Sequence, residues 1–365
     1  MRNEPRNESD NSYAAKCENI LQLGGLRTGT LDFPNPLGGQ SCRVAHVNTG
    51  SGLRLLVLLD RGADLGEATF NDTNLSFLSA NDYAPPSPAY NRETEWLRSW
   101  PGGMLTTGGP GRMGEARYEE GENVPLHGRF SQTPAAIVEV VNPDRLTNGT
   151  EMRLTAIIRD TKLFGPLLEV RRTWRFQLGL PIVHLEDVVT NVGDETTPHG
   201  LLYHINFGYP LLDEGARFIF AGKTQGHCLY QGYDAQQLSA TKMVPAPQER
   251  FRGAREGLLV VEPKGDDDWV RAGLINERRQ LAMEIAFSST DFPRMAHWQH
   301  FAPRGCYAAA LEPFSGSLFG LQNDSHSAAD LRLAPGQQRT YRLRLRILQG
   351  EAELAELRDQ DEPLE

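Results

Sequence analysis

The stretch Leu201-Leu202-Tyr203-His204-Ile205-Asn206-Phe207 has the alternation that predicts a β-strand. Its odd-numbered residues are all large and apolar, whereas the even-numbered positions carry His204 and Asn206. Successive side chains of a strand point to opposite faces, so one face suits a core and the other presents an imidazole and an amide. Such a strand would suit the floor of a ligand cleft. The alternative is a buried His204 that is bonded by a neighbouring carbonyl group.

Short alternating segments with turn signals between them continue along most of the chain. Only residues 350–358 look helical. The pattern predicts an all-β protein, a large antiparallel β-sandwich of stacked sheets. We expect a disordered or frayed tail over 1–16, a single domain over 17–350, and a short C-terminal helix and tail over 351–365. The expected strands include 53–59, 136–141, 152–159, 167–176, 182–190, 201–207, 217–221, 258–261, 280–287, 305–312, 327–333 and 340–348.

Composition narrows the range of partners. The net charge of −10 argues against nucleic acid as the main partner. No stretch approaches the ~20 apolar residues of a membrane span, and the first ten residues lack the apolar run of a secretory signal. The four cysteines are far apart, which favours reduced thiols in a cytoplasm over a zinc site or a redox dithiol. The oligomeric state is open, with a homodimer as one expectation.

Glu312 ends a run whose same-face neighbours, Cys306, Ala308 and Ala310, are all small. Small side chains leave room above the strand for a ligand or for a packed layer. Pro313 follows, so we expect the strand to stop there, at a rim where catalytic groups often lie. The alternative is an ordinary surface glutamate.

The region 81–129 is rich in glycine and proline and is expected to be a long loop, either on the surface or folded over a site. At its end His127 and Arg129 stand two residues apart and would project the same way if the segment is extended. Arg61, in a charged turn after the strand 53–59, could lie at the surface or reach into a cleft. Together His127, His204 and Glu312 would give a polar cleft its acid, orienting group and base. Three tryptophans could supply a sugar-stacking platform, namely Trp96, Trp100 and Trp298.

Several motifs together resemble the aldose 1-epimerase (galactose mutarotase) superfamily, and more closely an uncharacterised bacterial branch of it. The resemblance covers about residues 50 to 345, in matching order. The motifs are Asp60-Arg61-Gly62-Ala63-Asp64, Trp100-Pro101-Gly102-Gly103-Met104-Leu105-Thr106, Leu126-His127-Gly128-Arg129, Tyr203-His204-Ile205-Asn206-Phe207-Gly208-Tyr209-Pro210-Leu211 and Leu311-Glu312-Pro313.

This resemblance implies a large antiparallel β-sandwich with a cleft on one sheet, and no metal or cofactor for the chemistry. It places the general acid at His204 and the general base at Glu312. His127 would orient the substrate, with Arg129 beside it. The superfamily also has an acidic ligand for sugar hydroxyls between the second histidine and the glutamate, and no residue here can be assigned to that role from the motifs.

The implied activity is interconversion of the α and β anomers of a free or anionic sugar, by acid–base opening and closing of the ring. The expected substrate-binding residues are His127, Arg129, Asn206, Arg61, Trp298 and Trp100, with the two arginines suited to an anionic group. A non-catalytic carbohydrate-binding or sensing protein, or another sugar enzyme, are the alternatives. A glycosidase usually has two carboxylates at the bond, whereas here one glutamate faces two histidines.

Overall fold

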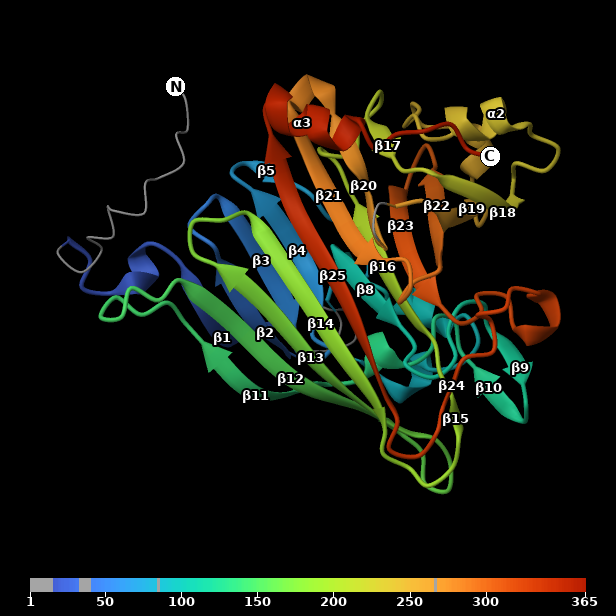
Figure 1. The fold of residues 1–365 in the computed structure, drawn as a ribbon, viewed down its shortest axis with the longest axis horizontal. Helices are drawn as coiled ribbons and strands as arrows, with labels where there is room; N and C mark the ends of the chain where they lie inside the picture. Colours follow the sequence, from blue (N-terminus) through green and yellow to red (C-terminus); the bar gives the residue numbers. More distant parts are fainter. Residues whose placement is uncertain (1–15, 33–40, 84–85, 266–267) are drawn as a thin grey trace.

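The computed structural model describes residues 16–32, 41–83, 86–265 and 268–365. Most of the described strands belong to two large antiparallel sheets, which lie face to face (Figure 1). The predicted tail over 1–16 lies, apart from Lys16, outside the described residues. The prediction of an all-β, large antiparallel β-sandwich is confirmed. The predicted domain boundary at 350 stays a prediction.

The first sheet has eleven strands within the described residues. Its neighbouring strands are, in order, β1 (Gly25–Asp32), β2 (Ser41–Asn48), β3 (Leu53–Leu58), β4 (Asp64–Phe70), β8 (Leu105–Gly108), β16 (Leu201–Phe207), β23 (Tyr307–Ser315), β22 (Arg294–Phe301), β19 (Gly257–Pro263) and β18 (Gly222–Cys228), and β5 (Thr73–Asn74) pairs with β4. The predicted strand 201–207 is therefore central in this sheet.

The second sheet has eight described strands, in the order β11 (Ala136–Val141), β12 (Glu151–Thr161), β13 (Leu167–Gln177), β14 (Ile182–Asn191), β25 (Gln338–Gln349), β21 (Leu281–Ser288), β20 (Trp269–Asn276) and β17 (Arg217–Ile219). Three small pairs complete the strands: β6 (Phe77–Leu78) with β7 (Gly102–Gly103), β9 (Arg117–Glu119) with β10 (Glu122–Val124), and β15 (Thr197–Pro198) with β24 (Arg332–Leu333). The helices are α2 (Ala235–Ala240), α3 (Glu351–Arg358) and short 3₁₀ turns at Ile20–Gln22, Pro88–Tyr90, Glu95–Arg98, Phe130–Gln132, Glu249–Phe251, Glu277–Arg279 and Leu321–Asn323.

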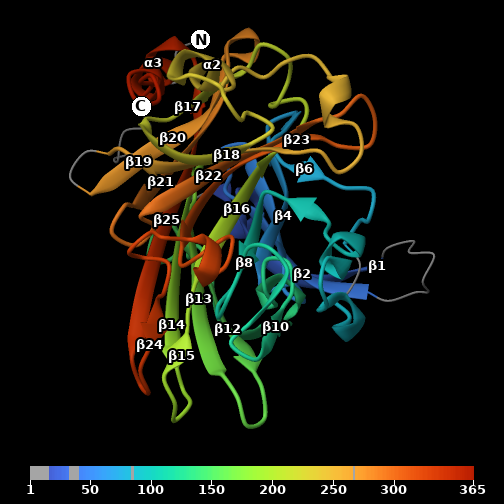
Figure 2. The same ribbon diagram turned by 90° about the vertical axis from the view of Figure 1, so that its right-hand side faces the viewer.

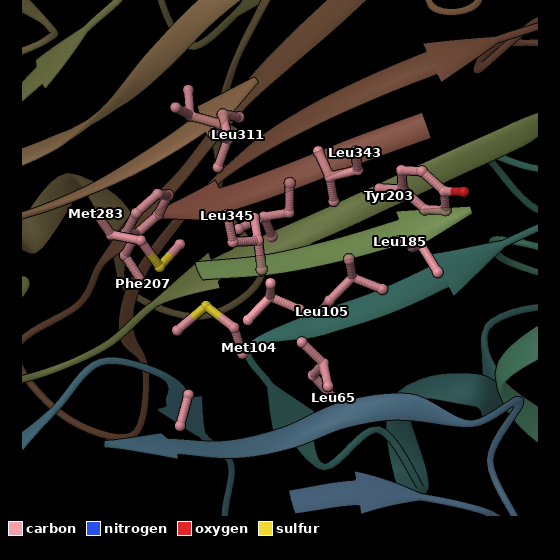
Figure 3. Packing of buried hydrophobic residues seen from close by; sticks show 14 of the residues in the cluster. Leu65, Met104, Leu105, Leu185, Tyr203, Phe207, Met283, Leu311, Leu343 and Leu345 are labelled. Atoms are coloured by element: carbon pink, nitrogen blue, oxygen red, sulfur yellow. The ribbon is translucent and has the colours of Figure 1, made fainter. Parts of the chain in front are cut away.

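The core lies between the two large sheets. Tyr203 and Phe207 of β16 point into it, as their alternation predicted, and meet side chains such as Leu343 and Leu345 from β25 (Figure 3). All seven residues of β16 are buried. Burial of large apolar side chains stabilises a fold by roughly 1.5–3 kcal/mol each, so this interface fixes which face of β16 turns away from the core.

A buried ionic cluster holds β16 from the core side. The guanidinium of Arg172 contacts Asp64 at 2.7 Å and Asp187 at 2.6 Å, and the Tyr203 hydroxyl donates to Asp187 at 2.8 Å. Both oxygens of Asp64 also accept from Thr107 of β8. Because all these charges are paired and hydrogen-bonded, the cluster joins β8, β13, β14 and β16 without leaving an isolated buried ion.

Several details differ from the sequence prediction. The region 81–129 is not one long loop, because it contains β7, β8, β9 and β10, and β8 lies beside β16 in the first sheet. The expected end of a strand at Glu312 is wrong, because β23 continues through Pro313 to Ser315. The pairing of β16 with β23 is interrupted between the pair Leu202–Phe314 and the pair Ile205–Leu311. Pro313 lies in this interruption, so the N–H group that proline lacks is not needed for pairing with β16. The expected strand 327–333 shrinks to Arg332–Leu333, and α2, a six-residue helix with a capping box at Asp234, was missed.

Candidate functional site

Two adjacent strands of the first sheet place His204 and Glu312 opposite one another. The β16–β23 alignment pairs Ile205 with Leu311 and Leu202 with Phe314, so the next position of each strand brings His204 level with Glu312. Side chains directly opposite in an antiparallel pair share a face and lie within reach. Here His204 Nε2 lies 3.2 Å from Glu312 Oε1. Both face away from the core that holds Tyr203.

Tryptophans surround this pair. Trp100 lies with its ring centroid 5.5 Å from that of His204, and its Nε1 donates to Thr106, the β8 neighbour of His204, at 3.1 Å. Trp96 stacks on Trp100 at 5.2 Å between centroids. Trp298 of β22 lies 5.6 Å from His204 on the other side. Ala308 and Ala310, the small residues of β23 before Glu312, are fully buried and do not line the cleft, and Ala308 packs in a cluster with Trp96 and Trp100. Of the two alternatives that the sequence left open above this strand, the structure has a packed layer at Ala308.

His127 reaches the same place from the segment that follows β10. Its ring centroid lies 5.5 Å from that of His204 and 5.0 Å from that of Trp96. The main chain holds it there, because the Gly109 amide donates to the His127 carbonyl at 2.9 Å. Gly109 has a φ of +111°, and a Cβ at that position would lie 2.2 Å from the Gly200 carbonyl oxygen. Gly109 therefore permits its backbone to pack closely against Gly200, and this close packing positions His127 at the cleft.

These groups line one cavity of about 480 Å³, here called the cleft. Its lining includes His127, His204, Glu312, Trp100 and Trp298, five of the eight residues expected at the site. Within the described part of the chain no lysine or arginine lines the cleft, and its carboxyl groups are Glu115, Glu256 and Glu312. The residues that line the cleft are Thr94, Trp96, Leu97, Trp100, Gly114, Glu115, Leu126, His127, His204, Gly253, Ala254, Glu256, Leu258, Trp298, His300, Cys306, Glu312, Leu318 and Phe319.

Burial sets the protonation of the paired groups. Desolvation raises the pKa of Glu312 well above its ordinary value, and the nearby charge of Glu256 adds to the effect. Desolvation lowers the pKa of His204 well below its ordinary value; the charge of His127 lowers it further, and an interaction with the Asn206 side chain opposes this. Burial lowers the pKa of His127 to about 4. Both shifts favour the uncharged forms, a neutral imidazole at His204 and a protonated carboxyl at Glu312.

Asn206 lies on the same face of β16 as His204 but below the cleft surface. Its side-chain amide donates to the Gly103 carbonyl at 2.9 Å and to the His204 carbonyl at 3.1 Å. It is completely buried and does not line the cleft. Its position suits the support of His204 more than contact with a ligand.

Neither arginine of the predicted site lies in the cleft. Arg61 is almost completely buried. Burial lowers the pKa of Arg61 to about 10, and the charges of Cys42 and Asp64 oppose this shift. His127 and Arg129 do not project the same way, because the segment is a turn: φ is +56° at His127 and +77° at Gly128. Arg129 consequently lines a different cavity. The assumption of an extended 127–129 segment was wrong.

Glu256 is the cleft residue that the sequence did not reveal. It accepts a hydrogen bond from Trp298 Nε1 at 2.6 Å, just before β19 begins at Gly257. His300 stacks on Trp298 with 17° between the ring planes, and both its ring nitrogens face backbone carbonyl oxygens. Glu256 also lies between His204 and Glu312 in the sequence, the interval in which an acidic ligand was expected. Nothing local distinguishes it from neighbouring surface glutamates such as Glu249.

The described residues contain no group of three or more histidine, cysteine, aspartate or glutamate side chains that could hold a metal ion. None of the described helices combines the length and the apolar character needed to cross a membrane.

Known structures share this fold. A candidate aldose 1-epimerase from Klebsiella pneumoniae subsp. pneumoniae MGH 78578 matches with a TM-score of 0.80 at 21% identity, over 94% of this chain and 89% of that chain. The Slr1438 protein from Synechocystis sp. PCC 6803 matches with a TM-score of 0.61 at 18% identity, over 88% of this chain and 96% of that one. A galactose mutarotase-like protein from Clostridium acetobutylicum gives 0.58 at 11% identity, over 89% and 98%.

These likenesses show that the fold is the galactose mutarotase-like β-sandwich that the motifs predicted. No curated protein matches the sequence. A family model described as a domain of unknown function, DUF4432, matches residues 39–347, which is most of the chain. The chain belongs to the DUF4432 family.

Proposed function

We propose that the protein is an aldose 1-epimerase that interconverts the anomers of an uncharged sugar in the cleft. The observation that supports this most is the 3.2 Å contact of His204 with Glu312 in a tryptophan-lined cavity. Opening a sugar ring needs a base at the anomeric hydroxyl and an acid at the ring oxygen. Those two oxygens are bound to the same carbon, so acid and base must lie close together.

In this proposal Glu312 takes the proton of the anomeric hydroxyl while His204 gives a proton to the ring oxygen. The bond between the anomeric carbon and the ring oxygen breaks, and an open-chain aldehyde forms. Rotation of the aldehyde followed by the reverse transfers closes the ring on its other face. No net proton is gained or lost.

The directions of the two pKa shifts suit this cycle, because both favour the uncharged forms of the pair. In the uncharged pair the shared proton lies on Glu312, whereas the reactive form needs it on His204. Transfer across the 3.2 Å contact therefore generates the acid and the base together, without a proton from solvent. A sugar that excludes water from the cleft would strengthen the attraction between the resulting charges.

Charge favours an uncharged substrate. Among the described residues the cleft lining has carboxyl groups but no lysine or arginine. A phosphate or carboxylate on the sugar would meet Glu115 and Glu256 without a cation to offset the repulsion. The indoles offer flat apolar faces to the C–H groups of a sugar ring, and Glu256 can accept from its hydroxyls. Glu256 would thus fill the role of the acidic hydroxyl ligand.

The test is anomer exchange measured by NMR at equilibrium, with the spontaneous rate subtracted. We expect the protein to accelerate exchange of at least one neutral aldose, and not of the matching uronate or sugar phosphate. His204→Asn should abolish the acceleration, whereas His46→Asn, an exposed site on β2, should leave it unchanged. Sugar binding without acceleration would contradict the proposal and favour a non-catalytic binding protein.

A further inference from the structure

A second cavity lies beside the turn that contains His127 and Gly128. It encloses about 350 Å³ between β10, the end of β12 and the segment that leads into β15, in the region where β9, β10, β15 and β24 gather in Figure 1. None of its described lining residues also lines the cleft. The two cavities are thus separate sites on either side of Gly128.

One cation of this second cavity lacks a carboxylate partner. Arg112, Lys162 and Arg332 each lie within 2.8 Å of a glutamate. Arg129 forms no ion pair with any described residue, and its one side-chain hydrogen bond is a long one, 3.4 Å to the Asn123 carbonyl oxygen. A half-buried guanidinium with most of its N–H groups unused is suited to bind a carboxylate by two parallel hydrogen bonds.

An acid faces the same space. Asp160, near the end of β12, lines the second cavity, and its carboxyl group makes no hydrogen bond with the described residues. Burial raises the pKa of Asp160, and the charge of Arg129 opposes that rise. The two groups are therefore close enough to interact although they do not form an ion pair. A cavity with opposite, unpaired charges favours a ligand that also carries both.

The cavity also has an apolar edge. Phe164, in the loop that joins β12 to β13, lines it, yet this side chain is 98% exposed. An exposed aromatic ring beside a cavity can lose that exposure by covering an apolar ligand, which is favourable at roughly 25 cal/mol per Å².

We propose that the second cavity binds a small zwitterion with an apolar side chain, of the α-amino-acid class. Its carboxylate would pair with Arg129, its ammonium group with Asp160, and its side chain with Phe164. Asp194 and Glu195 also line the cavity, but their side chains are exposed. The zwitterion pairs with Arg129 and Asp160 at once, which a simple anion or a simple amine cannot do. The inference does not depend on the proposed epimerase activity, because it is tested by binding alone.

The experiment is calorimetric titration of the full chain with three probes: L-phenylalanine, 3-phenylpropionate and phenethylamine. We expect L-phenylalanine to bind at least fivefold more tightly than either probe that lacks one charge. Arg129→Gln and Asp160→Asn should each weaken binding of L-phenylalanine by at least fivefold. Arg27→Gln, at an exposed site on β1, is the matched control and should bind as the wild type does.

Equal binding of L-phenylalanine and 3-phenylpropionate would overturn the proposal, as would no detectable binding of L-phenylalanine near its solubility limit. Binding that both variants leave unchanged would also overturn it, since the ligand would then lie elsewhere. The comparison of the three probes needs only the wild type, so the proposal stays testable if either variant fails to fold.

Discussion

Replacement of Glu312 by glutamine tests the base directly. Glutamine keeps the size of the side chain and removes its ability to accept a proton. A positioned general base contributes roughly 100- to 10,000-fold in rate, which corresponds to about 3–5.5 kcal/mol of barrier. Because the amide can still hydrogen-bond a sugar, we expect kcat to fall by that factor while KM changes little.

The same substitution should change stability in a direction that the structure fixes. Burial raises the pKa of Glu312 in the folded state above its ordinary 4.5. At a pH between those two pKa values the folded state keeps a proton that the unfolded state releases. The contribution of Glu312 to stability therefore falls as pH rises above 4.5, by about 1.4 kcal/mol per pH unit. Glutamine does not titrate. Glu312→Gln should therefore match the wild type at pH 4 and exceed its stability at pH 7.

The measurements are NMR anomer exchange on a sugar that the wild type accelerates, and urea denaturation at pH 4 and pH 7. Glu186→Gln, on β14 of the second sheet, is the control and should keep the wild-type rate. If Glu312→Gln exchanges the sugar within about threefold of the wild type, Glu312 is not the base. A folded variant with lower stability at pH 7 would show that the buried carboxyl is not protonated as argued.

Three further predictions follow from the same structure. Since burial lowers the pKa of His127 from 6.5 to about 4, the contribution of this group to the free energy of unfolding should fall by roughly 3 kcal/mol as pH drops through that interval, and His127→Gln should therefore gain stability relative to the wild type over that range in urea denaturation. Trp298→Phe removes the donor to Glu256 and should raise KM several-fold with less effect on kcat in the exchange assay; a change confined to kcat would contradict this assignment. Arg172→Met leaves two buried carboxyl groups without their cation and should cost about 3–5 kcal/mol in the free energy of unfolding, whereas a loss below 1 kcal/mol would mean that the cluster contributes little.

The strand 201–207 could be predicted from sequence because its alternation is complete. Period 2 alone assigned Tyr203 to the core and His204 to the opposite face, and the structure agrees. The small residues before Glu312 indicated a strand with either a ligand or a packed layer above it, and at Ala308 the structure has a packed layer with Trp96 and Trp100. Where that strand ends could not be predicted, because Pro313 is compatible with the sheet only through a local lapse in pairing with β16.

Arg129 and Glu256 show what local patterns cannot supply. The direction of Arg129 depends on two successive left-handed residues, and the positive φ of His127 is uncommon for a residue other than glycine. Glu256 belongs to the cleft because β19 brings it beside Trp298, a pairing of segments some 40 residues apart. Both placements come from tertiary contacts and leave no periodic signal in the sequence.

His204 and Glu312 lie opposite one another on two adjacent strands, and this arrangement restricts which insertions and deletions the protein can accept during evolution. Deletion of one residue within β16 would turn His204 into the core and Tyr203 into the cleft, so folding and chemistry would fail together. Length changes in β16 or β23 should therefore be eliminated by selection. Glu256 lies outside a strand, where insertions are tolerated. Under the proposed function, new sugar preferences can then arise from the segments around the cleft while His204 and Glu312 stay where the sheet puts them.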